Sequence, residues 1–579
     1  MLPAGIIIIA FLCSIQLAYK NQREHHGGLH GELVIPDGTA SIESYAFFEF
    51  RNITSVLIAD SVLRIKKGAF SGCIGLTTLV IPDSVIRIDE EAFYECQSLT
   101  VLKISNSIDT IGDKTFARCR GLTSVVIPDS VHTIGRRAFS GCIGLTSVVI
   151  PNSVHTICAG AFEDCIRLTS VVIPDSVITI EGLAFSNCSG LTSVLIVVIP
   201  DSVITIGVGA FCDCTSLTSV VIPNSVITIG DAAFKGCTCL TEVVLPNSVV
   251  SIARWAFHRC QGLTAVVIPD SVTNICEGAF YGCTGLTTVV IPDSVITIGD
   301  KAFLGCSGLT VVEIPASVTR IGSDAFCGCN RLTAVVLPQS LDTICSGVFK
   351  WCRSLTSVVI TNSVITIEGD AFRECTGLTA LVIPDSVTTI GGLPCGSGAF
   401  SGCTGLTVMV IPDSVHTIGE GAFCDCTSLT SVVIPNSVIT IGKGAFTRCS
   451  GLTSVVIPNS VITIGVCAFT LCTDLTSVVL PNSLITIGDG AFTLCTDLAS
   501  VEIPNSVITI GEGAFTHCTG LASVVIPDSV TTIGANAFRQ CTGLTEVVVP
   551  DHATLGDEAF PDGVTLTLSS EVVEIQPLK

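Results

Sequence analysis

The stretch from Leu429 to Gly451, LTSVVIPNSVITIGKGAFTRCSG, decides the fold because it recurs along nearly the whole chain. Its proline, Pro435, has counterparts such as Pro128 and Pro151, and neighbouring copies usually lie 23 residues apart. A fixed period of this size is typical of a solenoid, in which each repeat forms one coil stacked on its neighbours. The sequence therefore predicts about 23 coils between residues 32 and 560.

Each coil begins with the pattern of a strand. Residues 431–434 alternate between outward and inward side chains, so that Val432 and Ile434 face the interior while Val433 faces out. Pro435 and the Asn or Asp that follows it then end the strand and turn the chain.

The remainder of the coil supplies further interior positions. Val438 and Ile441 follow the turn at a three-residue spacing, and Gly442 permits a second corner. Ala445-Phe446 and Cys449 are expected to form a short helical turn that closes the coil. Stacked coils would then carry continuous interior ladders, in which each buried Phe or Leu contributes about 1.5–3 kcal/mol.

Composition and charge narrow the class of protein. Hydrophobic residues make up 48% of the chain and charged residues only 13%, which excludes a disordered chain. The net charge of −22 disfavours a nucleic acid partner, because an acidic surface repels phosphate backbones.

The N-terminus suggests an export signal. Residues 4–13 form an apolar run shorter than the roughly 20 residues that span a bilayer, so we expect a secretory signal cleaved near Ala18 and no stable transmembrane span. An apolar tail at a misassigned start is the alternative, and Leu12 argues against lipid attachment at Cys13. The expected divisions are a signal peptide (1–18), a polar linker or cap (19–31), the solenoid (32–560) and a C-terminal cap or tail (561–579).

The repeat also resembles a known family. The strand motif L-x-x-V-x-I and the continuation I-P-x-S-V-x-x-I-x-x-x-A-F-x-x-C-x-x-L are similar to those of BspA-like, or treponemal-type, leucine-rich repeats. The resemblance covers residues 32–560 and implies a β-rich α/β solenoid with a parallel sheet on its concave side. The resemblance also implies that the chain functions as a binding protein, a role that members of this family often have at cell surfaces.

Two insertions interrupt the 23-residue period. Three extra residues lie around 195–197, beside a strand, where we expect a bulge or a local break in the sheet. Five extra residues lie around 391–397, at a corner that tolerates added length.

Most of the 31 cysteines occupy one column that faces the core, including Cys73, Cys96 and Cys541. Their Cβ vectors are expected to be parallel, which favours a ladder of buried free thiols over disulfides. Cys158, Cys276 and Cys345 lie outside this column and are expected to be more exposed. Each C-x-C pair has one member in the core column, which argues against zinc.

The sequence contains no catalytic constellation, and we expect no enzyme, no cofactor and no metal. His132, His155 and His416 replace the first isoleucine of V-I-T-I and are expected to be surface substitutions with no carboxylate in a special register beside them. The histidines at 25, 26 and 30 fit a solvated linker better than a metal site. The Asp or Asn after each proline fits an Asx-type turn better than a calcium row.

The outward valine of each strand is the most informative candidate site. A long exposed row of valines marks a potential contact surface, although β-branched residues also favour strands for their own sake. The candidate residues are Val126, Val149, Val172, Val221, Val244, Val267, Val290, Val336, Val433, Val456, Val479 and Val525.

The sequence therefore leaves three hypotheses for function. The first is a secreted or surface-displayed scaffold that binds a protein ligand, with multivalent contacts because the repeats are uniform. The second is an intracellular interaction scaffold. The third is a binder of a regular surface such as ice or glycan, through the threonine rows of Thr430 and Thr440. Sequons at Asn52 and Asn187 permit glycosylation in a eukaryotic secretory pathway.

Overall fold

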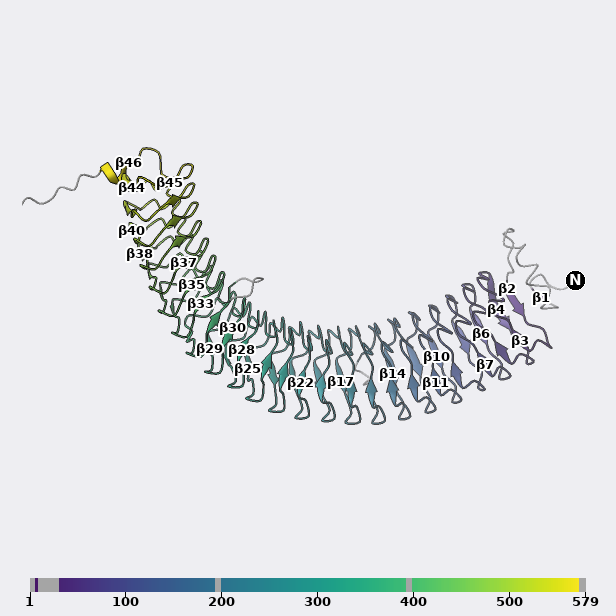
Figure 1. Ribbon diagram of the computed structural model, residues 1–579. Helices are drawn as coiled ribbons and strands as arrows, with labels where there is room; N and C mark the ends of the chain where they lie inside the picture. The colour runs from purple at the N-terminus through teal and green to yellow at the C-terminus, as the bar shows by residue number, and fades with distance from the viewer. Residues whose placement is uncertain (1–5, 9–30, 193–198, 392–397, 572–579) are drawn as a thin grey trace, which may run out of the picture. The chain divides into compact units, whose positions relative to one another are not determined.

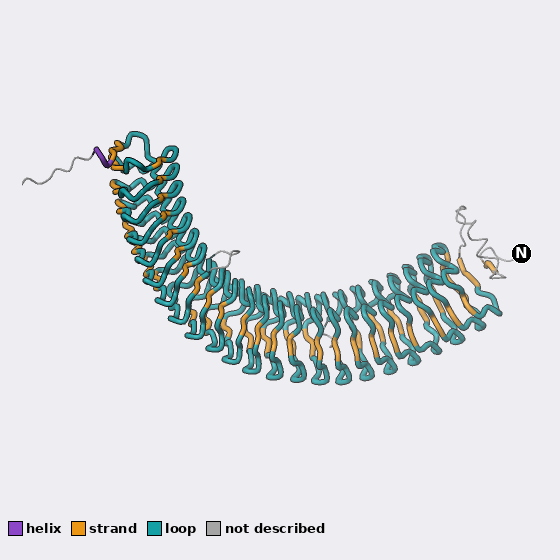
Figure 2. The backbone as a smooth tube through the Cα atoms, in the orientation of Figure 1, coloured by secondary structure: helices purple, strands orange, loops and turns teal. Residues whose placement is uncertain are grey.

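The computed structural model describes residues 6–8, 31–192, 199–391 and 398–571, which form a parallel β-solenoid. Each regular coil contributes two short strands, for example β34 (Ser431–Val433) and β35 (Thr440–Ile441) (Figure 1, Figure 2). The chain divides into two compact units, residues 1–286 and 287–579, which are described separately.

The second strands of successive coils pair in parallel and in register. In the first unit they form a six-stranded sheet of β9 (Thr110–Ile111), β11 (Thr133–Ile134), β13 (Thr156–Ile157), β15 (Thr179–Ile180), β16 (Thr205–Ile206) and β18 (Thr228–Ile229). In the second unit they form a ten-stranded sheet of β28 (Thr343–Ile344), β30 (Thr366–Ile367), β31 (Thr389–Ile390), β33 (Thr417–Ile418), β35, β37 (Thr463–Ile464), β39 (Thr486–Ile487), β41 (Thr509–Ile510), β43 (Thr532–Ile533) and β45 (Thr554–Leu555).

The phenylalanine column forms the centre of the core in both units. Phe446 is fully buried, and its ring stacks on Phe423 at 5.4 Å and on Phe469 at 5.2 Å between centroids. The other interior positions expected from the sequence, including Val432, Ile441 and Cys449, are buried as well. The coil interior is therefore confirmed.

Hydrogen bonds that follow the period join neighbouring coils. The Phe446 N–H donates to the carbonyl of Ala468, one coil later, at 2.8 Å. The Ser460 hydroxyl donates to the carbonyl of Val438, one coil earlier, at 2.6 Å. Because each coil satisfies polar groups of the next, backbone that would otherwise be buried without partners is paired.

The prediction of a helical turn around Ala445 and Phe446 is wrong. The solenoid is confirmed, but the described residues contain no α-helix and only one 3₁₀ helix, η2 (Ser569–Glu571), so the helical part of the α/β description does not hold. The reason is the backbone on both sides of the phenylalanine: Gly444 has φ near +60° and Arg448 has φ near +59°. A right-handed helix cannot pass through two left-handed residues, so the segment folds as successive tight turns.

The two insertions leave the core in register. Strand β15 pairs with β16 across the first insertion, matching Thr179 to Thr205. Across the second insertion, Phe372 still stacks on Phe400 at 5.4 Å with an interplanar angle of 1°. The expected bulge at residues 195–197 lies outside the described residues.

The ends of the described chain also follow the parallel pattern. Strand β1 (Ile6–Ile8) pairs with β2 (Gly31–Val34), and β44 (Glu546–Val549) pairs with β46 (Thr565–Leu568). Across the described ranges, no helix has the length and apolar character that a bilayer crossing requires.

Candidate binding surface

The twelve candidate valines form an exposed row in each unit, here called the Val row. Each is the third residue of its strand, one residue beyond a buried valine, so its side chain points outward. Their exposed fractions run from 50% at Val244 to 73% at Val172. The strands are β10 (Ser124–Val126), β12 (Ser147–Val149), β14 (Ser170–Val172), β17 (Ser219–Val221), β19 (Glu242–Val244), β21 (Ala265–Val267), β23 (Thr288–Val290), β27 (Ala334–Val336), β34, β36 (Ser454–Val456), β38 (Ser477–Val479) and β42 (Ser523–Val525).

Backbone pairing fixes the valines at regular intervals. Val126 is opposite Val149, and Val149 is opposite Val172 in the next strand. In the second unit Val456 is opposite Val479. Small polar side chains such as Ser454 and Ser477 share the same outward face and are also exposed. The result is an apolar row with a narrow polar border and few charges.

One part of the Val row is hollowed. A depression of about 540 Å³ lies between β19 and β21, and Val244 and Val267 line it together with Glu242 and Thr264. The site therefore has a local concavity at two of the candidate residues.

A second exposed apolar row was missed by the sequence analysis. It consists of the residue that precedes each second strand, as at Ile204, Ile439 and Ile462, and these three side chains are 45–47% exposed. The V-I-T-I motif carries the signal that could have found it, because two buried positions three residues apart leave the residues between them outside. This row is here called the Ile row.

The two threonine rows differ in their hydrogen bonds. The Thr430 hydroxyl donates to the carbonyl of Thr407 at 3.1 Å, and the Thr476 hydroxyl donates to that of Thr453 at 3.0 Å. Thr440 belongs to the ten-stranded sheet, all of whose ten members begin with an outward threonine, and no hydroxyl bond of these ten described threonines is observed. In the ten-stranded sheet, these described hydroxyls are therefore not bonded to the solenoid.

Some of the Asp and Asn residues that follow the proline position bond between coils. The Asn106 N–H donates to Asp83 Oδ1 at 2.9 Å, and the Asn247 N–H donates to Asn224 Oδ1 at 3.1 Å. These bonds explain why Asn and Asp interchange in this row. Within the part of the chain that the structure describes, no three His, Cys, Asp or Glu side chains are arranged to hold a metal ion.

The column cysteines are buried free thiols, as the sequence predicts. The Cys449 thiol donates to the carbonyl of Phe423 at 3.2 Å, and the same bond recurs in most coils. Burial raises the pKa of the Cys403 and Cys472 thiols to about 12, so both stay protonated and unreactive at neutral pH. Cys158, Cys276 and Cys345 are half-buried, and their pKa values are also raised by burial.

His258 has a strongly shifted pKa. It packs against Trp255 at 5.3 Å and Tyr281 at 4.7 Å between ring centroids. Burial, reinforced by Arg259 and Lys235, lowers the pKa of His258 to about 4, so the ring is neutral at physiological pH. Its packing among aromatic rings is that of a structural residue.

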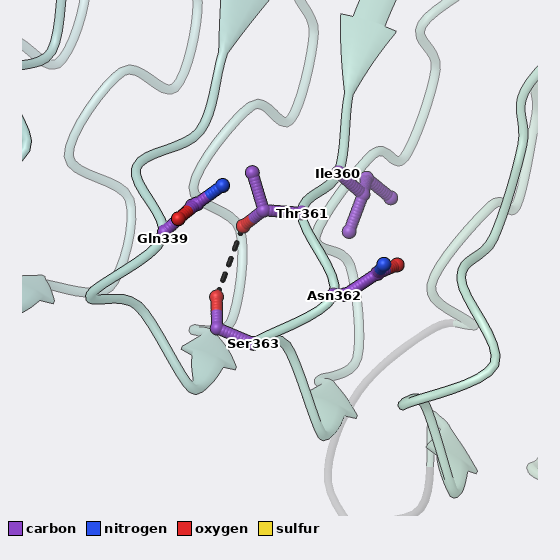
Figure 3. A pocket seen from close by; sticks show the side chains of 5 residues that line it. All are labelled: Gln339, Ile360, Thr361, Asn362 and Ser363. Carbon is purple, nitrogen blue, oxygen red and sulfur yellow. Dashed lines mark hydrogen bonds between the residues drawn. The ribbon is translucent and has the colours of Figure 1, made fainter.

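A smaller depression of about 480 Å³ lies in the second unit, where the usual proline is replaced by Thr361 (Figure 3). Gln339 and Asn362 line it, and the Thr361 and Ser363 hydroxyls are bonded at 3.0 Å. It is polar and shallow and brings none of the candidate valines together.

Both sequon asparagines are exposed. Asn52 lies in a turn, whereas Asn187 Nδ2 donates to Asp164 Oδ1 at 2.8 Å. Glycosylation of Asn187 would take place on the nitrogen that makes this bond.

Comparison with known proteins identifies the family. The model of the BspA-type leucine-rich repeat region matches overlapping segments that together cover residues 30–567. The chain therefore belongs to the BspA-type leucine-rich repeat family. No curated protein sequence matches the chain closely enough to count as a relative.

Solved structures of leucine-rich repeat proteins are similar to it. A protein from Bacteroides ovatus is 27% identical, with 77% of this chain and 92% of that chain covered and a TM-score of 0.39. The leucine-rich repeat protein of T. pallidum is 31% identical over 28% of this chain and 79% of that chain, with a TM-score of 0.26. A leucine-rich cell surface protein from Faecalibacterium prausnitzii is 24% identical over 70% of this chain and 88% of that chain, also with a TM-score of 0.26. The family assignment rests on the repeat model alone.

Proposed function

We propose that this chain is a non-enzymatic scaffold that binds a protein ligand through the Val row, on the outside of the cell. The observation that carries the proposal is the run of valines that are at least half exposed, in register and almost free of charge. Contiguous exposed apolar surface is uncommon on soluble proteins and marks interaction sites.

The rigidity of the row favours binding. Each strand pairs with at least one neighbour, and β12, β23, β27 and β38 pair on both sides, so little backbone freedom is lost when a partner docks. Because the row repeats the same chemistry in many coils, a partner with several contact points gains through multivalency rather than through one strong pocket.

The apolar run at residues 4–13 supports export, which the same proposal includes. Labelling of intact source cells with a membrane-impermeant amine reagent tests this part. Recovery of labelled chain trimmed near residue 18 is expected, whereas labelling only after lysis would show that the scaffold works inside the cell.

The binding test replaces Val433, Val456 and Val479 by Lys in one variant. This variant is expected to lose its binding to the extracellular proteins that bind the unaltered chain. The physical reason is that three cations in adjacent strands cannot be buried without partners. The matched control replaces Thr440, Thr463 and Thr486 by Lys in the same three coils, and it should retain binding. Unchanged binding by the valine variant would remove the Val row from the function.

A second candidate function is recognition of a regular surface such as ice. It is favoured by the ten in-register threonines of the ten-stranded sheet, whose hydroxyls are free of bonds to the solenoid. A thermal-hysteresis measurement tests it, with Thr440→Lys and Thr463→Lys combined as the disabling variant and Thr430→Val and Thr453→Val combined as the control. Absence of hysteresis in the unaltered chain would exclude ice as the ligand.

A further inference from the structure

Two histidines are neighbours in the Ile row of the first unit. The rings of His132 and His155 have their centroids 6.0 Å apart and are parallel within 3°. Both side chains are exposed, and the strands that follow them, β11 and β13, pair in register. The two imidazoles therefore leave the solenoid side by side in the same direction.

A carboxylate continues the same row, contrary to the expectation that none lies in register with these histidines. Asp109 precedes β9 as His132 precedes β11, and Thr110 is paired with Thr133. The His132 N–H donates to the Asp109 carbonyl at 2.8 Å, and the His155 N–H donates to the His132 carbonyl at 3.1 Å. Three successive coils thus present Asp, His and His from one backbone ladder.

The surroundings leave these side chains available. Thr110, Thr133 and Thr156 border them on one side and carry no charge. Arg87 lies one coil before Asp109, but its Nε bonds Asp89 at 2.8 Å and does not pair with Asp109.

We propose that His132 and His155 together chelate one borderline divalent cation, of the class of Ni²⁺ or Zn²⁺, with Asp109 strengthening the site. Imidazole is a preferred ligand of these ions, and two imidazoles on adjacent strands act as one chelating unit once their rings rotate to bring one nitrogen of each onto the ion. Because the two imidazoles supply only two ligands, the ion keeps open coordination positions. Those positions would take water or a ligand group from a second molecule.

Ni²⁺ binding to the full chain under reducing conditions tests the proposal, by isothermal titration or equilibrium dialysis. All variants carry Gln at positions 25, 26 and 30, which removes the N-terminal histidines from the measurement. We expect one Ni²⁺ per chain, and His132→Gln or His155→Gln should each weaken binding about a hundredfold, because a chelating pair becomes a single ligand. Asp109→Asn should weaken it severalfold.

His416→Gln is the matched control. His416 occupies the same row in the second unit and is also exposed, but its row neighbours are Thr388 and Ile439. Ni²⁺ affinity should not change in this variant. Equal affinity in His132→Gln and the unaltered background, or no binding up to about 1 mM Ni²⁺, would overturn the proposal.

Discussion

At the scale of single residues, the stacked phenylalanines are the largest side chains that the coils bury completely. Phe446→Ala should destabilise its surroundings by about 3–5 kcal/mol, because a fully buried ring is lost between Phe423 and Phe469. Hydrogen exchange over residues 423–469 is the suitable measurement, since a long repeat array need not unfold in one step. Val433→Ala, at an exposed position of the same region, should change the free energy of opening measured by hydrogen exchange by less than about 0.5 kcal/mol.

The buried thiols make the free energy of unfolding fall as the pH becomes alkaline. The folded-state pKa of Cys283, Cys403 and Cys472 is raised by burial to about 12, above the value near 9 that an exposed thiol has. Their contribution is therefore fully present below pH 9 and is lost as pH rises toward 12, since the unfolded chain releases these protons first.

Alkylation followed by mass spectrometry checks the burial and the raised pKa of the thiols on which this prediction depends. Among the described cysteines, the exposed Cys239 should react first at neutral pH, and the column thiols should react only in denaturant or at strongly alkaline pH. Rapid alkylation of Cys403 in the folded chain at pH 7 would contradict it.

At the scale of elements, the turn around each phenylalanine depends on left-handed residues. Gly444→Val should destabilise its coil by about 1–2 kcal/mol, because a β-branched residue is forced to φ near +60°. Leu471→Gly, at φ near +61° in the next coil, should be neutral or stabilising by up to about 1 kcal/mol. Local hydrogen exchange measures both, and equal effects of the two substitutions would show that backbone strain is not the determinant.

Strands, corners and buried columns could be predicted from the sequence, because period-2 alternation and the repeat length determine them directly. The turn could not, since Ala-Phe followed three residues later by Cys has the spacing of a helical turn. The frequent glycines two residues before the phenylalanine, as at Gly444 and Gly490, are the signal that the chain is left-handed there.

The candidate surface was predicted only in part for a related reason. Exposed valines on a strand follow from alternation, whereas the Ile row lies in the turn before a two-residue strand, where alternation gives no information. The proximity of Asp109, His132 and His155 depends on coil stacking, which converts a separation of 23 residues into adjacency.

At the scale of the whole molecule, the period rather than the identity of any coil maintains the fold. Deletion of residues 430–452, one full period of 23, should leave the solenoid folded, because Thr453 then takes the place of Thr430 and every column stays in register. Deletion of residues 430–440 alone should unfold the neighbouring coils, since it shifts buried columns to the surface.

Circular dichroism and limited proteolysis distinguish the two deletions. The full-period variant should keep the strand signal and resist cleavage, and the partial deletion should be cut near residue 430. Similar cleavage of both would show that the coils are not interchangeable.

The serine and phenylalanine bonds between neighbouring coils also have a mechanical consequence. Under a pulling force along the stack, a unit whose coils are joined by nearly identical contacts has no single weakest joint, so coils should detach one after another at similar forces. Each release frees a 23-residue segment, which lengthens the chain by about 75 Å, and the protein would behave as an extensible tether with evenly spaced steps.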